Sequence, residues 1–300
     1  MKAKINYFNS IEAAKILGVN VSTIKRWTDE GKLPCVKSAG GHRKFMMDHL
    51  SAFLAQHNKK ASKLSLFSIE SKNDLKISEA IIHSDYPSLV KQVLKQSFAC
   101  NRDRVQQVLN GMYLAQIELD VIYDKVITPV LYEIGLLWQN GDISVTEEHL
   151  ASQTLKEAIS RLQGIVTVPK QKKANILCLN FTHELHDIAL KMVDNILETQ
   201  GYRVLFSGQN TPLVDIESVF KKYKPEFVFI STTVPSVETQ TELDRLCRIC
   251  EKYKVSIFIG GRGMTELNLS HHSILAKLET YSDVKTSLER TKKLPNREFN

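Results

Sequence analysis

The sequence lacks long hydrophobic runs and has few cysteines. No apolar stretch among its 300 residues approaches the about 20 residues that a membrane-spanning helix needs. The N-terminal residues show no signal-peptide pattern, so we expect a cytoplasmic protein with no membrane partner. The five cysteines are an odd number scattered along the chain, which indicates reduced thiols rather than a disulfide framework.

Two of these cysteines, Cys247 and Cys250, have Cys-x-x-Cys spacing inside a helical pattern that runs from 242 to 253. No second pair lies nearby in the sequence, so two buried helix cysteines are favoured over a metal or redox site. The chain is too long for one small core, and its length suggests two or three domains.

Positive charge is concentrated in the N-terminal part. Residues 1–65 contain ten Lys and two Arg against four acidic residues, a net charge of +8, whereas the whole chain carries +7. A basic module on a neutral body is the pattern of a nucleic-acid-binding protein, because phosphate neutralisation supplies most non-specific affinity. A solvated basic face is the alternative.

Residues 1–57 have the pattern of a winged helix-turn-helix. Apolar spacing predicts helices over 11–17, capped by Ser10, and over 21–30, with a third over 46–57. A Gly-Gly turn between short apolar segments predicts a two-stranded wing. Polar residues near the start of the second helix and on the wing suit base and phosphate contacts. These candidate DNA contacts are Ser22, Thr23, Lys25, Arg26, His42, Arg43 and Lys44.

The segment from Ile11 through Trp27, with Gly40-Gly41-His42-Arg43-Lys44-Phe45, resembles the MerR-type DNA-binding domain. The resemblance implies a double-stranded DNA operator as partner, and a helical hairpin without DNA contact is the alternative. MerR proteins usually continue into a dimerising coiled coil, which is missing here. Residues 58–72, rich in Lys, Ser and Asn, have the composition of a flexible linker, so self-association must come from elsewhere.

Residues 73–168 are predicted to form a four-helix bundle. Asp85 precedes Tyr86-Pro87, a typical helix start, and apolar residues then recur at helical spacing. The later helices are expected over 102–116, 119–138 and 145–166.

Residues 169–300 alternate short apolar strands with helices. Strands are expected over 175–179, 203–206, 227–231, 256–259 and 276–280, and helices over 185–200, 213–223 and 236–253. This alternation predicts a parallel sheet wound with helices on both faces, which binds ligands at the carboxyl ends of its strands. The fold class is therefore multidomain α and α/β: a winged helix-turn-helix, a four-helix bundle and a flavodoxin-like doubly wound sheet.

Three motifs fall at these strand ends: Glu184-Leu185-His186-Asp187-Ile188-Ala189, Ser231-Thr232-Thr233 and Gly260-Gly261. Together they resemble the fingerprint of cobalamin-binding domains. The resemblance implies that His186 ligates cobalt from below and that a neighbouring carboxylate orients its ring. Glu184 stands at the motif's carboxylate position, and Asp187 is the weaker candidate. It also implies that Ser231 bonds the nucleotide base and that Gly260 and Gly261 allow close approach of the cofactor tail.

Two positions depart from the fingerprint. Ala189 stands where the motif has Gly, and Thr233 stands where it has Leu, so a domain that has lost cobalamin is the alternative. A zinc site at His183 and His186 is a second alternative, but no third or fourth ligand is evident from the sequence.

Trp138, followed after nine residues by Glu148-His149, resembles the cap signature of CarH-type cobalamin photoreceptors. The resemblance implies that Trp138 covers the upper corrin face and that Glu148 and His149 line the upper-ligand side. A core tryptophan with an exposed helical pair is the alternative. CarH-type proteins commonly have a His after this Trp, and Gln139 is a poor replacement as a cobalt ligand.

The domain order resembles that of the CarH/CarA/LitR group of regulators. It implies a non-enzymatic, cobalamin-dependent repressor that binds adenosylcobalamin, senses light and assembles as a dimer or tetramer. A light-independent cobalamin sensor and a cobalamin-free regulator acting through protein–protein contact are the alternatives. A corrinoid methyl carrier is a remote one, since the DNA-binding head argues against it.

Overall fold

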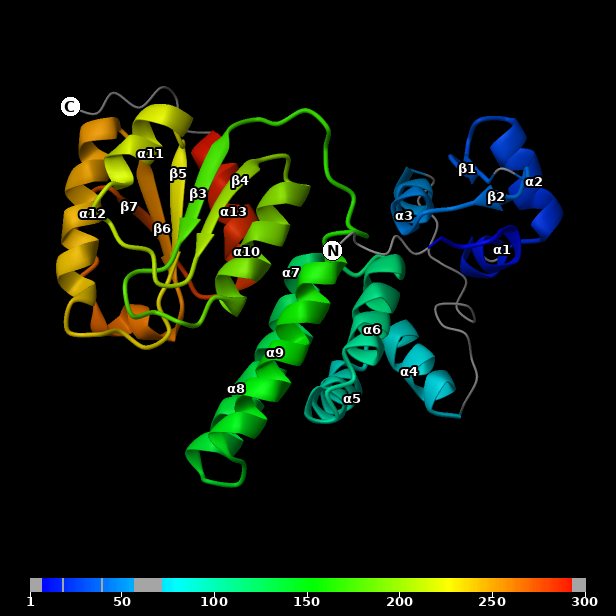
Figure 1. Cartoon of the computed structure of the whole chain (residues 1–300), viewed down its shortest axis with the longest axis horizontal. Coiled ribbons are helices and arrows are strands. Elements are labelled where there is room, and N and C mark those ends of the chain that lie inside the picture. The colour runs from blue at the N-terminus through cyan, green and yellow to red at the C-terminus, as the bar shows by residue number, and fades with distance from the viewer. Residues whose placement is uncertain (1–6, 18, 39, 57–71, 293–300) are drawn as a thin grey trace. The chain divides into compact units, whose positions relative to one another are not determined.

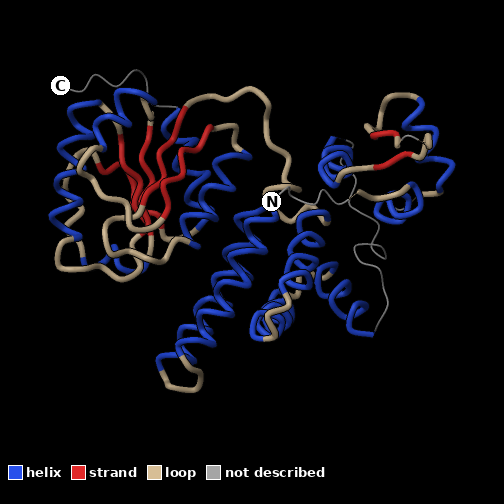
Figure 2. Tube along the Cα trace, viewed as in Figure 1, coloured by secondary structure: helices blue, strands red, loops and turns tan. Residues whose placement is uncertain are grey.

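The computed structural model describes residues 7–17, 19–38, 40–56 and 72–292 (Figure 1). The chain divides into two compact units, Met1–Thr167 and Val168–Asn300, which are described separately. The first unit is helical apart from one small two-stranded sheet, whereas strands and helices alternate in the second (Figure 2). Among the described residues, no helix has the length and apolar character needed to cross a membrane.

The N-terminal part of the first unit is a winged helix-turn-helix, as predicted. Its elements are α1 (Ser10–Leu17), α2 (Val21–Asp29), β1 (Val36–Lys37), β2 (Arg43–Lys44) and α3 (Met47–Gln56). The strands pair antiparallel to form the wing, and Phe8 bridges to Phe45 beside it. Trp27 of α2 packs on Phe53 of α3 with ring centroids 4.7 Å apart. Apolar spacing also predicts that Leu54 packs inward from this helix, but its side chain lies outside those that the structure describes.

The cap of the first helix differs from the prediction. Asn9, not Ser10, accepts hydrogen bonds from the backbone N–H groups of Ile11 and Glu12. The Glu12 carboxylate in turn accepts from the N–H of Asn9 at 2.7 Å. This reciprocal arrangement satisfies donors at both ends of the first turn, which a cap at Ser10 does not.

The rest of the first unit is a helical bundle. Its elements are α4 (Lys72–Ile82), α5 (Tyr86–Phe98), α6 (Arg102–Leu114), α7 (Leu119–Ile122), the π-helical turn η1 (Tyr123–Ile127), α8 (Thr128–Gln139) and α9 (Val145–Leu162). Asp85 caps α5, as the sequence indicated, by accepting from Ser88 N–H at 3.2 Å. Ser144 and Glu147 form a capping box at the start of α9.

Helix α4 was not predicted, because the first helix of the bundle was expected to begin at Asp85, although Ile77 and Ile81 have helical spacing and are buried. Its buried Asp74 forms an ion pair with Arg104 of α6, which ties α4 to the bundle. The single helix expected over 119–138 contains the π-helical turn η1. A π-helical turn adds one residue to the helix, and this leaves the spacing of apolar residues too similar to reveal it in the sequence.

The second unit is a five-stranded parallel sheet with the flavodoxin-like order β4-β3-β5-β6-β7, as predicted. The strands are β3 (Asn175–Leu179), β4 (Arg203–Gly208), β5 (Phe227–Ser231), β6 (Ser256–Gly260) and β7 (Ile274–Leu278). The helical elements are α10 (Ile188–Thr199), α11 (Ile216–Tyr223), α12 (Thr239–Tyr253), the 3-10 helix η2 (Arg262–Glu266) and α13 (Tyr281–Lys292). Helices α10 and α13 cover one face of the sheet, and α11 and α12 cover the other (Figure 1).

Each of the three predicted helices in this unit begins three residues later than expected, at Ile188, Ile216 and Thr239. The loop before α10 is hydrogen-bonded to Asn210 and Thr233 of the neighbouring loops, and the backbone N–H of Ser236 bonds the hydroxyl of Thr239 at the start of α12. The sequence missed this because apolar periodicity continues through residues whose polar groups bond to other loops. Strand β7 also begins two residues before its predicted start.

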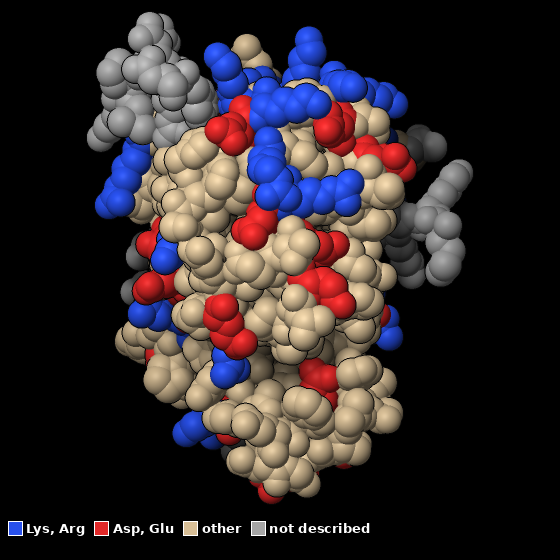
Figure 3. All heavy atoms as spheres, turned by 90° about the vertical axis from the view of Figure 1, so that its left-hand side faces the viewer, with Lys and Arg blue, Asp and Glu red and all other residues tan. Residues whose placement is uncertain are grey.

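Lysine and arginine side chains gather at the top of the helical face seen in Figure 3. Lys221 and Lys222 lie in the last turn of α11, and Lys252 lies in the last turn of α12. Cations at helix C-termini complement the partial negative charge of the backbone there. This basic surface therefore has a local electrostatic explanation and does not by itself indicate a second nucleic-acid site.

Candidate functional site

The loop from 180 to 187 links β3 to α10 and carries His186 at the carboxyl edge of the sheet. Its backbone is turned by His183, whose φ of 70° is left-handed. Asn180 anchors the start of the loop, because its side-chain amide donates to the carbonyl of His186 at 2.9 Å. The loop is therefore a defined structure that presents one face of residues 184–186 to neighbouring loops.

Glu184 is the centre of this loop and is only 4% exposed. One carboxylate oxygen accepts from the N–H groups of Thr233 at 2.6 Å and Val234 at 3.1 Å. The other accepts from the N–H of His186 at 2.9 Å and bonds its ring Nδ1 at 2.7 Å. Burial opposes the charge of Glu184, but these hydrogen bonds outweigh it and hold the pKa of the carboxyl below its usual value.

The His186 side chain is 59% exposed although its partner is buried. A proton held on Nδ1 by Glu184 places the imidazole lone pair on Nε2, the nitrogen on the opposite side of the ring. A neutral imidazole oriented by a carboxylate is a typical ligand for cobalt and related metals. The donor set therefore fits the metal ligand that the fingerprint implies.

Ser231, the last residue of β5, and Thr232, the next residue, supply two buried hydroxyl groups. Their side chains are 4% and 2% exposed, and neither oxygen has a hydrogen-bond partner within the part of the chain that the structure describes. The side-chain oxygen of Asn180 is also buried without a hydrogen-bond partner among the described residues. Buried polar atoms without partners are costly, so a ligand with polar groups at this edge would satisfy them.

Gly260 ends β6 directly opposite Ser231, and Gly261 follows in a left-handed conformation with φ of 95°. A Cβ on Gly261 would lie 2.2 Å from the carbonyl oxygen of Thr232. A Cβ on Gly260 would lie 3.1 Å from the carbonyl oxygen of Leu278. Packing thus requires glycine at position 261, whatever it contributes to a cofactor tail, whereas a side chain at 260 would make a tight contact with the backbone of Leu278.

The remaining fingerprint positions lie beside this cluster. Ala189 is half-buried in the first turn of α10, and its carbonyl accepts from the hydroxyl of Tyr281 at 3.5 Å. Asp187 is buried at the start of that helix and makes no side-chain capping bond. Thr233 is half-buried, and its backbone N–H bonds Glu184. This backbone contact was not visible in the sequence, since any residue except Pro can make it.

The predicted cap residues belong to the other unit. Trp138, near the end of α8, is 50% exposed and so is not a core tryptophan of the bundle. Glu148 on α9 contacts the ring Nδ1 of His149 and accepts from Ser152 at 2.6 Å. Further large apolar side chains are exposed on these two helices: Tyr132, Val145 and Leu150. Gln139 is exposed at the last position of α8.

The predicted DNA contacts lie on α2 and the wing. On α2, Ser22, Lys25 and Arg26 are exposed and Thr23 is half-buried, and on the wing His42 and Lys44 are exposed. Arg43 differs, because its guanidinium pairs with Asp29 of α2 at 2.5 Å and its side chain is only 20% exposed. The structure therefore shows Arg43 joining the wing to α2, a role that the sequence analysis missed.

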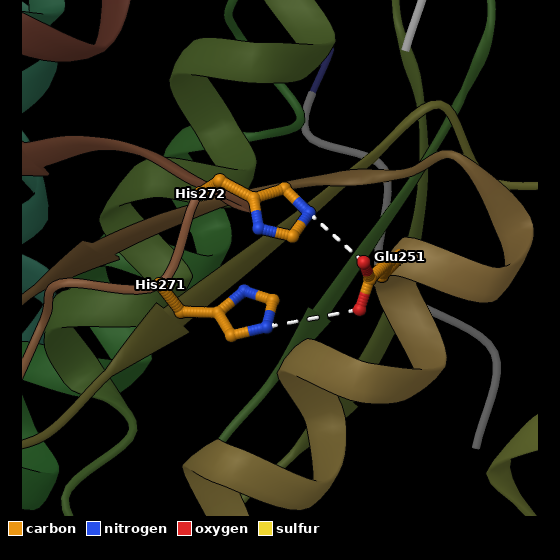
Figure 4. Close-up of side chains that lie close together, drawn as sticks. All are labelled: Glu251, His271 and His272. Atoms are coloured by element: carbon orange, nitrogen blue, oxygen red, sulfur yellow. Dashed lines mark ion pairs between the residues drawn. The ribbon is translucent and has the colours of Figure 1, made fainter. Parts of the chain in front are cut away.

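A group of ligand-type side chains not seen in the sequence lies at the opposite edge of the sheet. Glu251 of α12 faces His271 and His272, with Nε2–carboxylate distances of 3.9 and 3.4 Å (Figure 4). The two rings are stacked at 4.4 Å with an interplanar angle of 25°. A metal must lie in the plane of each imidazole that binds it, which nearly parallel rings do not allow.

The hydrogen-bonding of His271 agrees with this interpretation. Its Nδ1 accepts from the N–H of Ser273 at 3.2 Å, so the ring proton of the neutral form is on Nε2, facing Glu251. The arrangement is a carboxylate that faces two stacked histidine rings. Among the described residues it is the only set of three ligand-type side chains close enough to hold a metal, so His183 and His186 gain no third zinc ligand.

Cys247 and Cys250 are both buried on α12, as favoured by the sequence. Burial raises the pKa of the Cys247 thiol to about 11 and raises that of Cys250 further. Neutral, buried thiols of this kind are poor nucleophiles.

Comparisons with known proteins identify three regions. A helix-turn-helix domain matches residues 7–58, and two B12 binding domains match residues 89–163 and 174–272. The HTH-type transcriptional repressor CarH of Myxococcus xanthus is 26% identical over 193 residues, which cover 64% of this chain and 62% of CarH. The HTH-type transcriptional repressor CarA of the same organism is 26% identical over 174 residues, 56% of each protein.

Proteins of another class are also similar. The dimethylamine corrinoid protein 3 of Methanosarcina acetivorans is 20% identical over 188 residues, which cover 61% of this chain and 87% of that protein. The structure of the Methanosarcina barkeri monomethylamine corrinoid protein matches 68% of this chain and 99% of its own length, with a TM-score of 0.51 at 15% identity. This structural likeness concerns the fold alone.

Proposed function

We propose that this chain, which joins an N-terminal helix-turn-helix domain to a helical and a Rossmann-like B12-binding domain, is a cobalamin-dependent transcriptional repressor resembling CarH and CarA. The observation that carries the proposal is the presence of two sites in one chain. One is the exposed basic surface of α2 and the wing, and the other is the Glu184–His186 pair at the carboxyl edge of the sheet.

In the cofactor site, His186 would bind cobalt through Nε2 while Glu184 holds its ring. The hydroxyl groups of Ser231 and Thr232, which are buried without partners among the described residues, would bond polar atoms of the cofactor tail. Ala189, Thr233, Asp187 and the two glycines would line the same edge. Bound adenosylcobalamin would supply a cobalt–carbon bond that light can break.

In the cap, half-exposed Trp138 would cover the upper face of the corrin, with Glu148 and His149 beside the upper ligand. Exposed apolar side chains on α8 and α9 support this role, because a monomeric protein seldom leaves several large apolar groups on one hairpin uncovered.

In the DNA-binding domain, α2 would enter the major groove and the wing would contact the backbone. Ser22, Thr23, Lys25 and Arg26 would act from the helix, and His42 and Lys44 from the wing. A dimer or tetramer would pair two such heads and raise the affinity for a double-stranded operator. If one oligomeric form binds the cofactor more tightly than another, cofactor binding would favour that form and so control DNA binding.

Light dependence is the part of the proposal that Gln139 opposes, since an amide replaces the imidazole usual in photoreceptors of this group. A repressor that senses cobalamin in the dark is therefore the second candidate function. A methyl carrier is supported by the similarity to corrinoid proteins of Methanosarcina. The helix-turn-helix domain argues against it, because it has no use in methyl transfer.

The test is to mix the purified full chain with adenosylcobalamin in the dark and record the visible spectrum and the elution volume before and after green light. Binding to genomic DNA fragments is measured on the same samples. The matched variants are H186A and H183N, because His183 lies in the same loop and Asn tolerates its left-handed backbone.

Co-elution of cobalamin with the wild type and H183N, and weaker binding by H186A, supports the cofactor site. A change of size and of DNA binding on illumination supports the photoreceptor form. Binding without any light response assigns the protein to dark cobalamin sensing. Absence of cobalamin binding contradicts the proposal and leaves a regulator that has lost its ligand.

A further inference from the structure

The loop that carries His186 is held from outside by a second carboxylate. Glu242, in the first turn of α12, accepts from the backbone N–H of Thr182 at 3.0 Å with one oxygen. Its other oxygen accepts from the Thr182 hydroxyl at 2.6 Å. Both carboxylate oxygens thus bond one residue, four positions before His186, and this fixes the direction in which the loop leaves β3.

Asn210 holds the middle of the same loop. Its side-chain oxygen accepts from the N–H of His183 at 3.0 Å, and its own N–H donates to the carbonyl of Glu184 at 3.0 Å. Both Asn210 and His183 have left-handed backbones, with φ of 52° and 70°. Such conformations cost free energy and persist where the surrounding structure enforces them.

We propose that Glu242 is a positioning residue for the cobalt ligand: through Thr182, and together with Asn210, it holds the loop in the conformation that keeps the His186 ring on Glu184. This inference rests on the proposed cobalamin site, but it concerns residues outside the fingerprint. The fingerprint explains the ring's contact with Glu184, whereas nothing within it explains why residues 182 and 183 are held in place.

The physical argument is one of preorganisation. A metal ligand on a loop must be held close to its bound geometry, or part of the binding free energy is spent on ordering the loop. The backbone N–H groups of Thr182 and His183 both bond side chains from other elements, so the loop is ordered by α12 and by the segment after β4. Loss of either contact would release the loop while leaving Glu184 and His186 chemically intact.

The test uses the full chain loaded with cob(II)alamin. Nitrogen superhyperfine splitting in its electron paramagnetic resonance spectrum, compared between protein with ¹⁴N- and ¹⁵N-labelled histidine, reports imidazole bound to cobalt and separates it from the nitrogen of the cofactor's own base. A visible titration gives the affinity. E242Q keeps the size of the side chain but removes its charge, and its N–H₂ group cannot accept from the Thr182 hydroxyl, so the charge-assisted bond that this hydroxyl donates is lost. E251Q is the matched control, because it makes the same change on the same helix at the opposite edge of the sheet.

We expect E242Q to lower the fraction of imidazole-bound cobalt and to weaken cobalamin binding by about 10-fold, the lower end of the range for groups that orient a metal ligand. E251Q should match the wild type in both measurements. N210G keeps the left-handed backbone but removes the side chain, and it should act in the same direction as E242Q. N210D retains the accepting oxygen and should preserve the wild-type signal.

A double-mutant cycle with T182V tests the route of the effect. If Glu242 acts through Thr182, the double variant should lose little more than E242Q alone. Thermal unfolding without cofactor identifies a variant that fails to fold, and T182V then serves as the milder test. The inference is wrong if E242Q, T182V and N210G fold and keep the wild-type splitting. If the wild type itself binds no cobalamin, it is the proposed function that fails.

Discussion

One oxygen of Glu184 bonds both the backbone N–H and the ring Nδ1 of His186, at 2.9 and 2.7 Å. The other oxygen bonds the loop after β5 through Thr233 and Val234. A single buried carboxylate therefore fixes the ring of His186 and also links two strand ends. The first prediction follows from this double role.

E184Q should weaken cobalamin binding by about 10- to 100-fold and also destabilise the cofactor-free protein. The amide has one oxygen, and its N–H₂ group would face N–H donors, so at least one buried group loses its partner at about 1–3 kcal/mol. Visible titration and urea unfolding measure the two effects. H186A, which leaves the carboxylate in place, should lose affinity with a smaller loss of stability, and the reverse order would contradict this division of roles.

The sequence predicted the sheet order and the three strand ends because both follow from short-range patterns. Buried strands read as apolar runs, and their alternation with helices restricts the topology. Ser231 and Gly260 therefore stand where the prediction placed them, paired across β5 and β6. Trp138 and Glu148, which the resemblance assigns to the cap, lie on adjacent helices of one hairpin, and their role beside a corrin stays a prediction.

The sequence could not predict contacts that depend on the path of the loops. Glu242 falls inside the helix predicted over 236–253, where no partner is evident from the sequence, yet it bonds a residue 60 positions earlier. Asp29 and Arg43, 14 residues apart, looked like a surface acid and a DNA contact. Opposite charges that meet across loops carry no period, so only the folded chain shows them.

The second prediction concerns Gly261. G261A should destabilise the α/β unit by more than about 3 kcal/mol, since the new Cβ meets the carbonyl oxygen of Thr232 at 2.2 Å and the left-handed backbone is strained as well. G201A is the matched control in the same unit. Its φ of 87° is also left-handed, but its Cβ would meet side-chain atoms no closer than 3.4 Å. Urea unfolding measures the free energy of unfolding of both variants. Equal losses would show that the left-handed backbone, and not the contact with Thr232, causes the destabilisation.

The third prediction concerns the wing. K44A should weaken DNA binding and reduce the slope of log affinity against log salt by about 1, as expected when one phosphate contact is lost. The side chain of Lys44 is exposed on β2 and lies 5.6 Å from the Tyr7 ring, so its removal leaves the core intact. K76A, an exposed lysine on α4 in the bundle, is the control and should leave the slope unchanged. Fluorescence anisotropy at several salt concentrations makes the comparison.

The fourth prediction concerns Asp29, which the structure pairs with Arg43. Two effects of D29N oppose each other: it removes a negative charge near the DNA, and it also releases the wing from α2. If Arg43 mainly orients the wing, D29N should reduce operator selectivity while non-specific affinity rises slightly. Competition between operator and random DNA measures this. A uniform gain in affinity with selectivity intact would instead assign Arg43 to direct phosphate contact.

The fifth prediction concerns pH. Burial raises the pKa of the Cys247 thiol to about 11, so the folded state holds a proton that the unfolded chain releases near the ordinary thiol pKa of about 8.5. The stabilising effect is therefore fully present below pH about 8.5 and is lost as the pH rises towards about 11. Urea unfolding at increasing pH should show this loss, and C247A should reduce its slope. Exposed Cys100 should react with a thiol reagent at pH 8 before Cys247 does. Rapid reaction of both Cys247 and Cys250 in the folded protein would contradict their burial and would reopen the redox interpretation of that pair.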